Sequence, residues 1–271
     1  MILCMQDKSY FLIKLSKLME STFDFVNPYI FKVVSFLMNL FKPGEERVLI
    51  YTDSRGYEVT KAYNRRNPMS SYVWKLMKDY RCDVFLCPEK STSLIDFLYF
   101  WKRNEKKRKV KYRYVILHCG IVDFSPRPES SYESIIRSKM DKIQFLNLDS
   151  YFEKRTTGPL YENELTMSVA TIELVENYYV PFLQKIDGLI YIGVNPVIPT
   201  WKGHYWRMRP ENINEILRFD AIMCKEIANI IKLSNWNNSS IMSNTVDNVH
   251  YNRKGFGIIY RQIIQAMSFF K

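Results

Sequence analysis

Short apolar runs alternate with amphipathic stretches along most of this chain, and that alternation predicts strands followed by helices. Four runs bounded by polar or turn-forming residues are typical of buried strands: 47–52, 82–87, 112–119 and 188–193. A weaker fifth strand is expected around 240–243. Strands that alternate with helices favour a largely parallel sheet that is covered on both faces. We therefore expect an α/β protein with a sheet of about five strands.

Apolar residues that recur every three or four positions predict the intervening helices. Residues 56–80 are expected to be helical in two pieces, and a capping-box pattern begins a helix over 93–101. Further helices are expected over 165–186, 210–231 and 256–267. The stretch from 124 to 164 has no such pattern and is expected to be a long irregular cover that carries at most short helices.

The first part of the chain has a different character. Two strongly apolar stretches, 10–15 and 29–41, precede a polar, turn-forming break. A membrane-spanning helix needs about 20 largely apolar residues, and extending the second stretch that far takes in Asp24 and Pro28. We expect an N-terminal apolar helical segment over 1–45 that packs on the rest of the protein, forms a homodimer contact or lies on a membrane surface through residues 9–41.

Composition narrows the class of protein. The chain has 271 residues, of which 47% are hydrophobic and 15% aromatic, and this excludes a disordered chain. Its five cysteines are odd in number and show no paired spacing, and its start does not resemble a cleavable signal peptide. We expect free thiols, buried as small hydrophobes, and a cytoplasmic protein, with a place peripheral to the inner face of a membrane as the alternative.

The net charge of +11 owes much to a basic run over 102–113. Such a run suits nucleic acid, anionic lipid headgroups or an acidic glycan, and it equally suits a solvated helix end and loop. The run has no interleaved aromatic residues of the kind that stack on bases, and no nucleic-acid-binding motif accompanies it. We therefore expect no nucleic-acid partner.

Three polar clusters follow predicted strands or precede the final helix: 52–56, 120–123 and 247–250. Ligands of parallel α/β sheets bind beyond the carboxyl ends of the strands, so we expect these clusters to lie at one edge of the sheet.

A nucleophilic serine needs a base within hydrogen-bond reach, and the base needs a carboxylate that orients it. Among the three histidines, His118 lies in an apolar strand and His204 in a surface loop, whereas His250 follows Asp247 by three residues. We expect Asp247 to hold one imidazole nitrogen and Ser54 to meet the other. Because the histidines lack metal-ligand spacing and no Cys-x-x-Cys is present, we expect no metal and no cofactor.

These clusters resemble the motifs of one enzyme family. Thr52-Asp53-Ser54-Arg55-Gly56 resembles the Gly-Asp-Ser block of the SGNH/GDSL hydrolases, Gly120-Ile121-Val122-Asp123 is similar to their Gly-x-Asn-Asp block, and Asp247-Asn248-Val249-His250 to their Asp-x-x-His block. The resemblance spans about 47–271. It implies a catalytic domain over 46–271 with a flavodoxin-like three-layer α/β/α sandwich, a Ser54–His250–Asp247 triad, and acyl transfer to water or another hydroxyl.

The departures from that pattern concern the oxyanion hole. Val122 stands where the family has an asparagine donor, and losing one such donor typically costs about 3–4 kcal/mol of transition-state stabilisation. The resemblance puts the Ser54 N–H in the hole and makes Gly120 and Asp123 candidate oxyanion or substrate residues. The turn after the second strand lacks the family's glycine, yet an N–H of Lys90 or Ser91 can still donate. Arg127 is our candidate for the missing donor.

The sequence thus favours a serine esterase or O-acyltransferase that acts on an acylated, specifically O-acetylated, carbohydrate or small ester through an acyl-Ser54 intermediate. Aromatic and basic residues suited to sugar rings and acidic groups cluster in one loop: Trp201, Lys202, Tyr205, Trp206, Arg207 and Arg209. The apolar N-terminus keeps a lipid-facing esterase open, and Val122 keeps open a non-catalytic binding protein on the SGNH fold.

Overall fold

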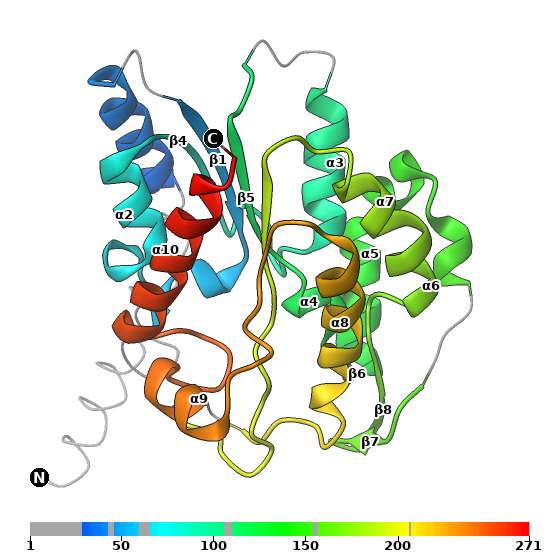
Figure 1. The fold of residues 1–271 in the computed structure, drawn as a ribbon. Helices are drawn as coiled ribbons and strands as arrows, with labels where there is room; N and C mark the ends of the chain where they lie inside the picture. Colours follow the sequence, from blue (N-terminus) through cyan, green and yellow to red (C-terminus); the bar gives the residue numbers. More distant parts are fainter. Residues whose placement is uncertain are drawn as a thin grey trace, which may run out of the picture.

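A five-stranded parallel sheet lies at the centre of the molecule (Figure 1). The structure is a computed structural model and describes residues 29–42, 46–59, 66–105, 110–153, 157–205 and 207–270. The sheet order is β10-β9-β5-β1-β4, and every pairing is parallel. Its strands are β1 (Arg47–Thr52), β4 (Arg81–Leu86), β5 (Tyr114–His118), β9 (Leu189–Ile192) and β10 (Ile230–Ile231).

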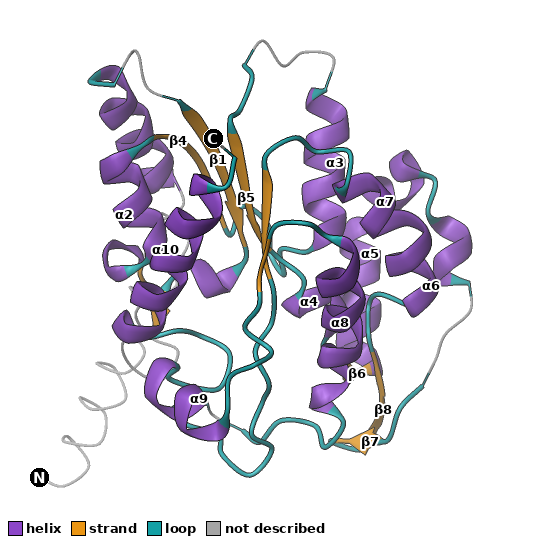
Figure 2. Cartoon of the chain, in the orientation of Figure 1, coloured by secondary structure: helices purple, strands orange, loops and turns teal. Residues whose placement is uncertain are grey.

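Helices cover both faces of the sheet (Figure 2). Alternate side chains of β1 point to opposite faces, so Val48 and Ile50 join one apolar cluster and Leu49 and Tyr51 the other. The first cluster includes side chains of α2 (Tyr72–Asp79) and α10 (Arg253–Ser268). The second includes those of α3 (Leu94–Asn104), α5 (Glu129–Leu146), α6 (Ile172–Leu174), α7 (Val180–Leu183) and α8 (Ile216–Glu226). The expected three-layer α/β/α sandwich with flavodoxin-like strand order is confirmed.

Shorter elements surround this sandwich. Some of them form two small antiparallel sheets, β2-β3 and β6-β8-β7. Their bounds, with those of the remaining short helices, are η1 (Ser54–Gly56), β2 (Glu58–Val59), β3 (Arg66–Asn67), η2 (Pro68–Ser70), α4 (Ile121–Phe124), β6 (Arg127–Pro128), η3 (Asp149–Phe152), β7 (Leu160–Tyr161), β8 (Glu164–Met167), the π-helical η4 (Val175–Tyr179), η5 (Ile213–Glu215) and α9 (Asn238–Asn244).

The expectation of an irregular stretch over 124–164 is wrong. It contains α5, the longest helix with both ends in the described chain, with buried residues at three- and four-residue spacing. One of these is Lys139, whose ammonium pairs with the buried Asp96 of α3. A lysine on the inner face interrupts the apolar pattern by which a buried helix is recognised in the sequence. Its burial is possible because Asp96 on α3 compensates the charge.

Three other elements differ from expectation. The first helical piece of 56–80 is replaced by β2 and β3, and Asn67 is extended as expected of a residue before proline. The run at 240–243 lies in α9, because the Asn237 side chain accepts from the Ser240 N–H (2.8 Å) and begins a helix. The fifth strand is instead β10, where the predicted long helix has already ended.

The expected helix over 165–186 begins later. Residues 164–167 form β8, which pairs with β6 and β7, and the helical residues start at Ile172. The Thr171 hydroxyl accepts from the Leu174 N–H (3.1 Å) and caps this start.

The N-terminal segment is described from residue 29, and the apolar stretch 10–15 lies outside the described residues. A helix over 29–40 packs on the edge strand β4. The Asn39 amide donates to the Cys82 carbonyl (2.7 Å) and accepts from the Cys82 N–H (2.9 Å), and the buried Ser35 hydroxyl also donates to that carbonyl. These bonds satisfy backbone groups that an edge strand leaves open.

The other side of this helix is apolar and exposed, with Phe36 63% and Leu40 59% exposed. None of the described helices is both long and apolar enough to cross a bilayer. A membrane-surface or homodimer contact of residues 9–41 stays a prediction, as does the division of the chain at residue 45.

Candidate active site

Ser54 lies directly beyond the carboxyl end of β1, the strand between β4 and β5. The Asp53 N–H donates to the His118 carbonyl (3.0 Å), and the Asp53 carboxylate accepts from the Arg55 N–H (2.9 Å). That second bond caps the 3₁₀ turn that Ser54 begins. The turn therefore fixes the serine at the sheet edge where the sequence placed it.

His250 and Asp247 meet this serine from a loop before α10. The His250 Nε2 lies 3.1 Å from the Ser54 Oγ, and its Nδ1 lies 2.8 Å from the Asp247 Oδ2. The other Asp247 oxygen accepts from the backbone N–H groups of Val249 (3.1 Å) and His250 (2.7 Å). The three side chains form one continuous hydrogen-bonded chain, with each imidazole nitrogen next to the partner that we expected for it.

The charge of Asp247 is strongly favoured. Burial alone would raise its pKa, but the charge of His250, two hydrogen bonds from His250 and the nearby Arg209 together hold the pKa well below its usual range. The Arg209 Nη2 lies 3.7 Å from the carboxylate. Asp247 is thus held ionised, which is the form that orients an imidazole and stabilises an imidazolium.

Asn248 holds the loop between the two triad residues in place. It has a φ of 71°, a left-handed conformation in which asparagine is common. Its side-chain oxygen accepts from the Ile198 N–H (2.9 Å), its amide donates to the Trp201 carbonyl, and its own carbonyl accepts from Asn195 (2.8 Å). These contacts tie the loop to the segment after β9.

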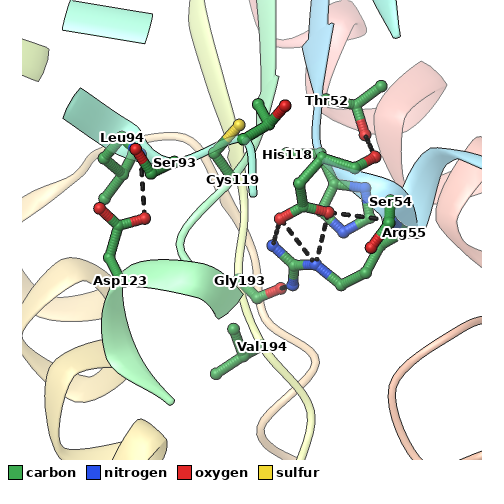
Figure 3. Close-up of polar contacts among 12 residues, drawn as sticks. Thr52, Ser54, Arg55, Ser93, Leu94, His118, Cys119, Asp123, Gly193 and Val194 are labelled. Atoms are coloured by element: carbon green, nitrogen blue, oxygen red, sulfur yellow. Dashed lines mark hydrogen bonds and ion pairs between the residues drawn. The ribbon is translucent and has the colours of Figure 1, made fainter. Parts of the chain in front are cut away.

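A buried ion pair lies beneath the serine turn, and the sequence reasoning missed its role. Figure 3 shows the Arg55 guanidinium next to Gly193. Its Nη2 lies 2.9 Å from the Asp53 carboxylate, and its Nη1 donates to the Gly193 carbonyl (3.1 Å). Both side chains are 1% exposed. The pair braces the turn and joins it to the end of β9.

Gly56 allows this turn to lie close to the sheet. A Cβ there would approach the Leu86 Cδ1 to 2.5 Å and the Thr52 Cγ2 to 2.7 Å. The motif's final glycine is therefore required by packing.

A cleft of about 410 Å³ opens over Ser54 and His250. Its lining includes Lys90, Ser91 and Arg127, three of the residues expected to contact substrate or the oxyanion. Ser91 has a φ of 53°, a conformation that favours glycine, at the turn where the family pattern has one. The Thr92 hydroxyl donates to the Glu89 carbonyl (2.7 Å) and so fixes this turn.

Gly120 and Asp123 do not line the cleft, which corrects the expectation for both. The Asp123 carboxylate accepts from the Leu94 N–H (2.9 Å) at the start of α3, as Figure 3 shows, and from the Tyr179 hydroxyl (3.3 Å). Burial raises the pKa of Asp123 to about 7. Gly120 has a φ of 120°, and a Cβ there would lie 2.7 Å from the Tyr191 Oη. Both residues serve the packing of the strand end, whereas Val122 does line the cleft.

Other singled-out residues divide between core and surface. His118 is buried, its Nδ1 lies 2.9 Å from the Tyr72 hydroxyl, and burial lowers its pKa. Tyr205 lines the cleft, whereas Trp201, Lys202 and His204 do not. Trp206 and residues 106–109 of the basic run lie outside the described residues. Within the described chain, no cluster of three or more His, Cys, Asp or Glu side chains is placed to hold a metal ion.

Comparisons with known proteins give no assignment by sequence. No family model matches the chain, and no curated protein matches it. Among solved structures, a lipase/acylhydrolase from Enterococcus faecalis is similar, with a TM-score of 0.48 and 13% identity over 82% of this chain and 96% of that one. A protein from Parabacteroides merdae described as a GDSL-like lipase has a TM-score of 0.42 and 12% identity over 84% and 97% of the two chains. Because both TM-scores are below 0.5, the description of the fold rests on the sheet order, and that of the site on the hydrogen bonds around Ser54.

Proposed function

We propose that this chain is an SGNH-type serine hydrolase that cleaves carboxylic esters through an acyl-Ser54 intermediate. The observation that carries this proposal is the hydrogen-bonded chain from Ser54 through His250 to the ionised Asp247. A serine hydroxyl, an imidazole and a carboxylate in this order are the parts of a nucleophilic triad, whatever the fold that presents them.

In the proposed reaction the Ser54 Oγ attacks the ester carbonyl while the His250 Nε2 takes the hydroxyl proton. Asp247 keeps the proton on Nδ1 and stabilises the imidazolium. The tetrahedral intermediate collapses, the C–O bond to the alcohol breaks, and His250 gives the proton to the departing oxygen. Water or a sugar hydroxyl then attacks the acyl-Ser54 ester by the same steps, which frees Ser54 and releases an acid or a new ester.

The oxyanion of that intermediate needs donors within the cleft. We assign the Ser54 N–H as the first, because it adjoins the nucleophile at the start of the turn. For the second we favour an N–H of the Lys90–Ser91 turn, which lines the same cleft. Val122 also lines it but has no side-chain donor, so a backbone N–H has to take the place of the family's asparagine.

An O-acetylated carbohydrate is the substrate we propose. Tyr161 and Tyr205 line the cleft, and aromatic rings of this kind pack against sugar rings. Transfer of the acyl group to a second sugar hydroxyl would make the enzyme an O-acyltransferase, and the same triad serves either outcome. A lipid-facing esterase is the second candidate, favoured by the exposed apolar side of the helix over 29–40.

The experiment combines a fluorophosphonate probe with short- and long-chain 4-nitrophenyl esters. We expect labelling of the wild type and of Ser131→Ala, another serine of the cleft lining, and none of Ser54→Ala. Hydrolysis of acetyl esters above longer chains supports the carbohydrate proposal, and the reverse preference supports the lipid-facing one. A wild type that neither labels nor hydrolyses any ester would favour a non-catalytic binding protein and end the hydrolase proposal.

A further inference from the structure

Three arginines line the same cleft as the triad: Arg127, Arg207 and Arg209. We call them the arginine subsite. They come from two segments about 80 residues apart in the sequence, which the small antiparallel sheet brings together. Arg127 is in β6, which pairs with β8, and β8 pairs with β7. The Tyr161 hydroxyl of β7 donates to the Met208 carbonyl (2.6 Å), between the other two arginines.

The carboxylates around the cleft are already paired. Asp53 is held by Arg55 (2.9 Å), and Glu89 lies 3.0 Å from the Lys142 Nζ. Glu162 accepts from Arg207, and Asp247 is committed to His250. Among the described residues of the lining, Asp53 and Glu89 are the only carboxylates, whereas Lys90 and the three arginines are cationic. The cleft therefore has an excess of positive charge.

Two of these guanidinium groups have buried nitrogens without a hydrogen-bond partner among the described residues. They are the Nε of Arg127 and the Nε and Nη2 of Arg209. The Arg209 guanidinium lies over the Tyr205 ring, 3.4 Å from its centroid, and its side chain is 15% exposed. Buried polar groups are normally hydrogen-bonded, and leaving one unpaired is unfavourable, more so when it is charged.

The charges of the three arginines also favour a bound anion. Burial lowers the pKa of Arg127. Tyr205 and Asp123 raise it, whereas the neighbouring charges of Arg209 and Arg207 lower it further. Like charges held together in a half-buried wall repel one another, and an anion placed among them relieves that repulsion. A guanidinium presents a planar fork of donors that matches the two oxygens of a carboxylate or phosphate.

We propose that the arginine subsite binds an anionic group of the substrate, a carboxylate or a phosphate on the sugar that bears the ester. The guanidinium groups of Arg127 and Arg209 donate to it, and Arg207 adds charge while it stays paired with Glu162. The substrate class is then an acylated acidic carbohydrate. As a statement about the substrate, this rests on the proposed function. As a statement about binding, it rests on the arginines alone.

This assignment gives Arg127 a different role from that of an oxyanion donor, and the two roles have different consequences. An oxyanion donor acts on every ester, so its loss lowers kcat/KM for neutral and anionic esters alike. A subsite arginine acts only on the anionic group, so its loss lowers kcat/KM for anionic esters relative to kcat/KM for neutral esters.

Binding is tested on Ser54→Ala, which keeps the cleft and does not turn over substrate. Calorimetric titration with glucuronate, glucose 6-phosphate and glucose is expected to give binding of at least one acidic sugar at least tenfold tighter than glucose. The tighter acidic sugar identifies the carboxylate or the phosphate as the anion. Adding Arg127→Gln or Arg209→Gln is expected to weaken that binding tenfold or more, about 1.4 kcal/mol. Arg137→Gln, on the exposed side of α5, is the charge-matched control and is expected to bind like the parent.

Equal binding of glucose and both acidic sugars, or variants that bind like the Arg137→Gln control, would overturn the proposal. Calorimetric binding of inorganic sulfate or phosphate to the unmodified protein gives a readout that needs neither a variant nor turnover, so a misfolded variant does not leave the test open. The absence of such binding at millimolar concentrations counts against the subsite.

Turnover is tested with 4-acetoxybenzoate and its neutral methyl ester. Arg127→Gln is expected to lower the anionic-to-neutral ratio of kcat/KM at least tenfold, and a ratio equal to that of the wild type contradicts the subsite. If no ester is hydrolysed while acidic sugars still bind through the arginines, the hydrolase proposal fails and the subsite stands. If esters are hydrolysed without preference for acidic substrates, the subsite fails alone.

Discussion

The triad and the arginine subsite line one cleft, yet the protein satisfies their polar groups to different degrees. Each nitrogen of His250 has a partner, both oxygens of Asp247 accept hydrogen bonds, and Asp53 is clamped by Arg55. Arg127 and Arg209 instead have buried nitrogens with no hydrogen-bond partner in the described residues, although the Arg209 Nη2 lies 3.7 Å from Asp247. The first region is organised before any ligand arrives, as catalytic groups need to be. The second is completed only when an anion binds.

The largest expected effect comes from breaking the satisfied region at its carboxylate. Asp247→Asn keeps the shape but removes the charge that fixes the imidazole tautomer and stabilises the imidazolium. We expect kcat on 4-nitrophenyl acetate to fall about 10³- to 10⁴-fold, with the melting temperature changed by only a few degrees. A fall of less than about tenfold would show that Asp247 does not orient a catalytic base.

The next largest effect is expected at the buried Asp53–Arg55 ion pair beneath the serine turn. Arg55→Leu places an apolar residue where the family has one, but it leaves the buried Asp53 carboxylate without its cation. Breaking a buried pair in this way typically costs about 3–5 kcal/mol. We expect urea unfolding of the variant to show a loss of that size. The double variant Asp53→Asn/Arg55→Leu removes both charges and is expected to recover much of that loss. Wild-type stability of the single variant would mean that the pair does not brace the turn.

Arg209 belongs to both regions and so sharpens the comparison between them. It lies 3.7 Å from Asp247 and also in the arginine subsite. We expect Arg209→Lys to lower kcat/KM for neutral esters about threefold, and for anionic esters about tenfold or more, because an ammonium lacks the planar fork. Equal losses on the two substrates would place Arg209 with the triad alone.

The smallest expected effect is at Ser91, whose left-handed backbone strains a non-glycine residue. Ser91→Gly relieves that strain, and we expect the free energy of unfolding to rise by up to about 1 kcal/mol, offset in part by the greater entropy of glycine in the unfolded chain. A backbone donor at this turn is kept by the change, so activity on neutral esters is expected to stay within about twofold. A larger loss would point to the Ser91 side chain as a substrate contact.

The N-terminal helix shows where sequence patterns alone stop being informative. Its apolar residues predicted a helix, but Asn39 and Ser35 decide which side meets the domain, because they bond to Cys82 on the edge strand. Hydrogen bonds to a strand more than 40 residues away leave no local signal. The exposed apolar side keeps the three expected roles of this segment open to experiment.

The sequence by itself determined four of the five parallel strands and the positions of the triad. Apolar strands bury both faces, so their runs are continuous and readable, and the polar residues that follow them fall at one edge by topology. Ser54 and the Asp247–His250 pair were therefore predictable from position and chemistry. α5 was not, because its inner face includes Lys139, which is buried only through Asp96 on another helix. Asp123 shares the strand-end position but faces Leu94, and Arg127 meets Arg207 and Arg209 only through the pairing of β6, β8 and β7. The burial of Lys139 and the contacts of Asp123 and Arg127 depend on residues far away in the sequence, and only the tertiary structure brings those residues together.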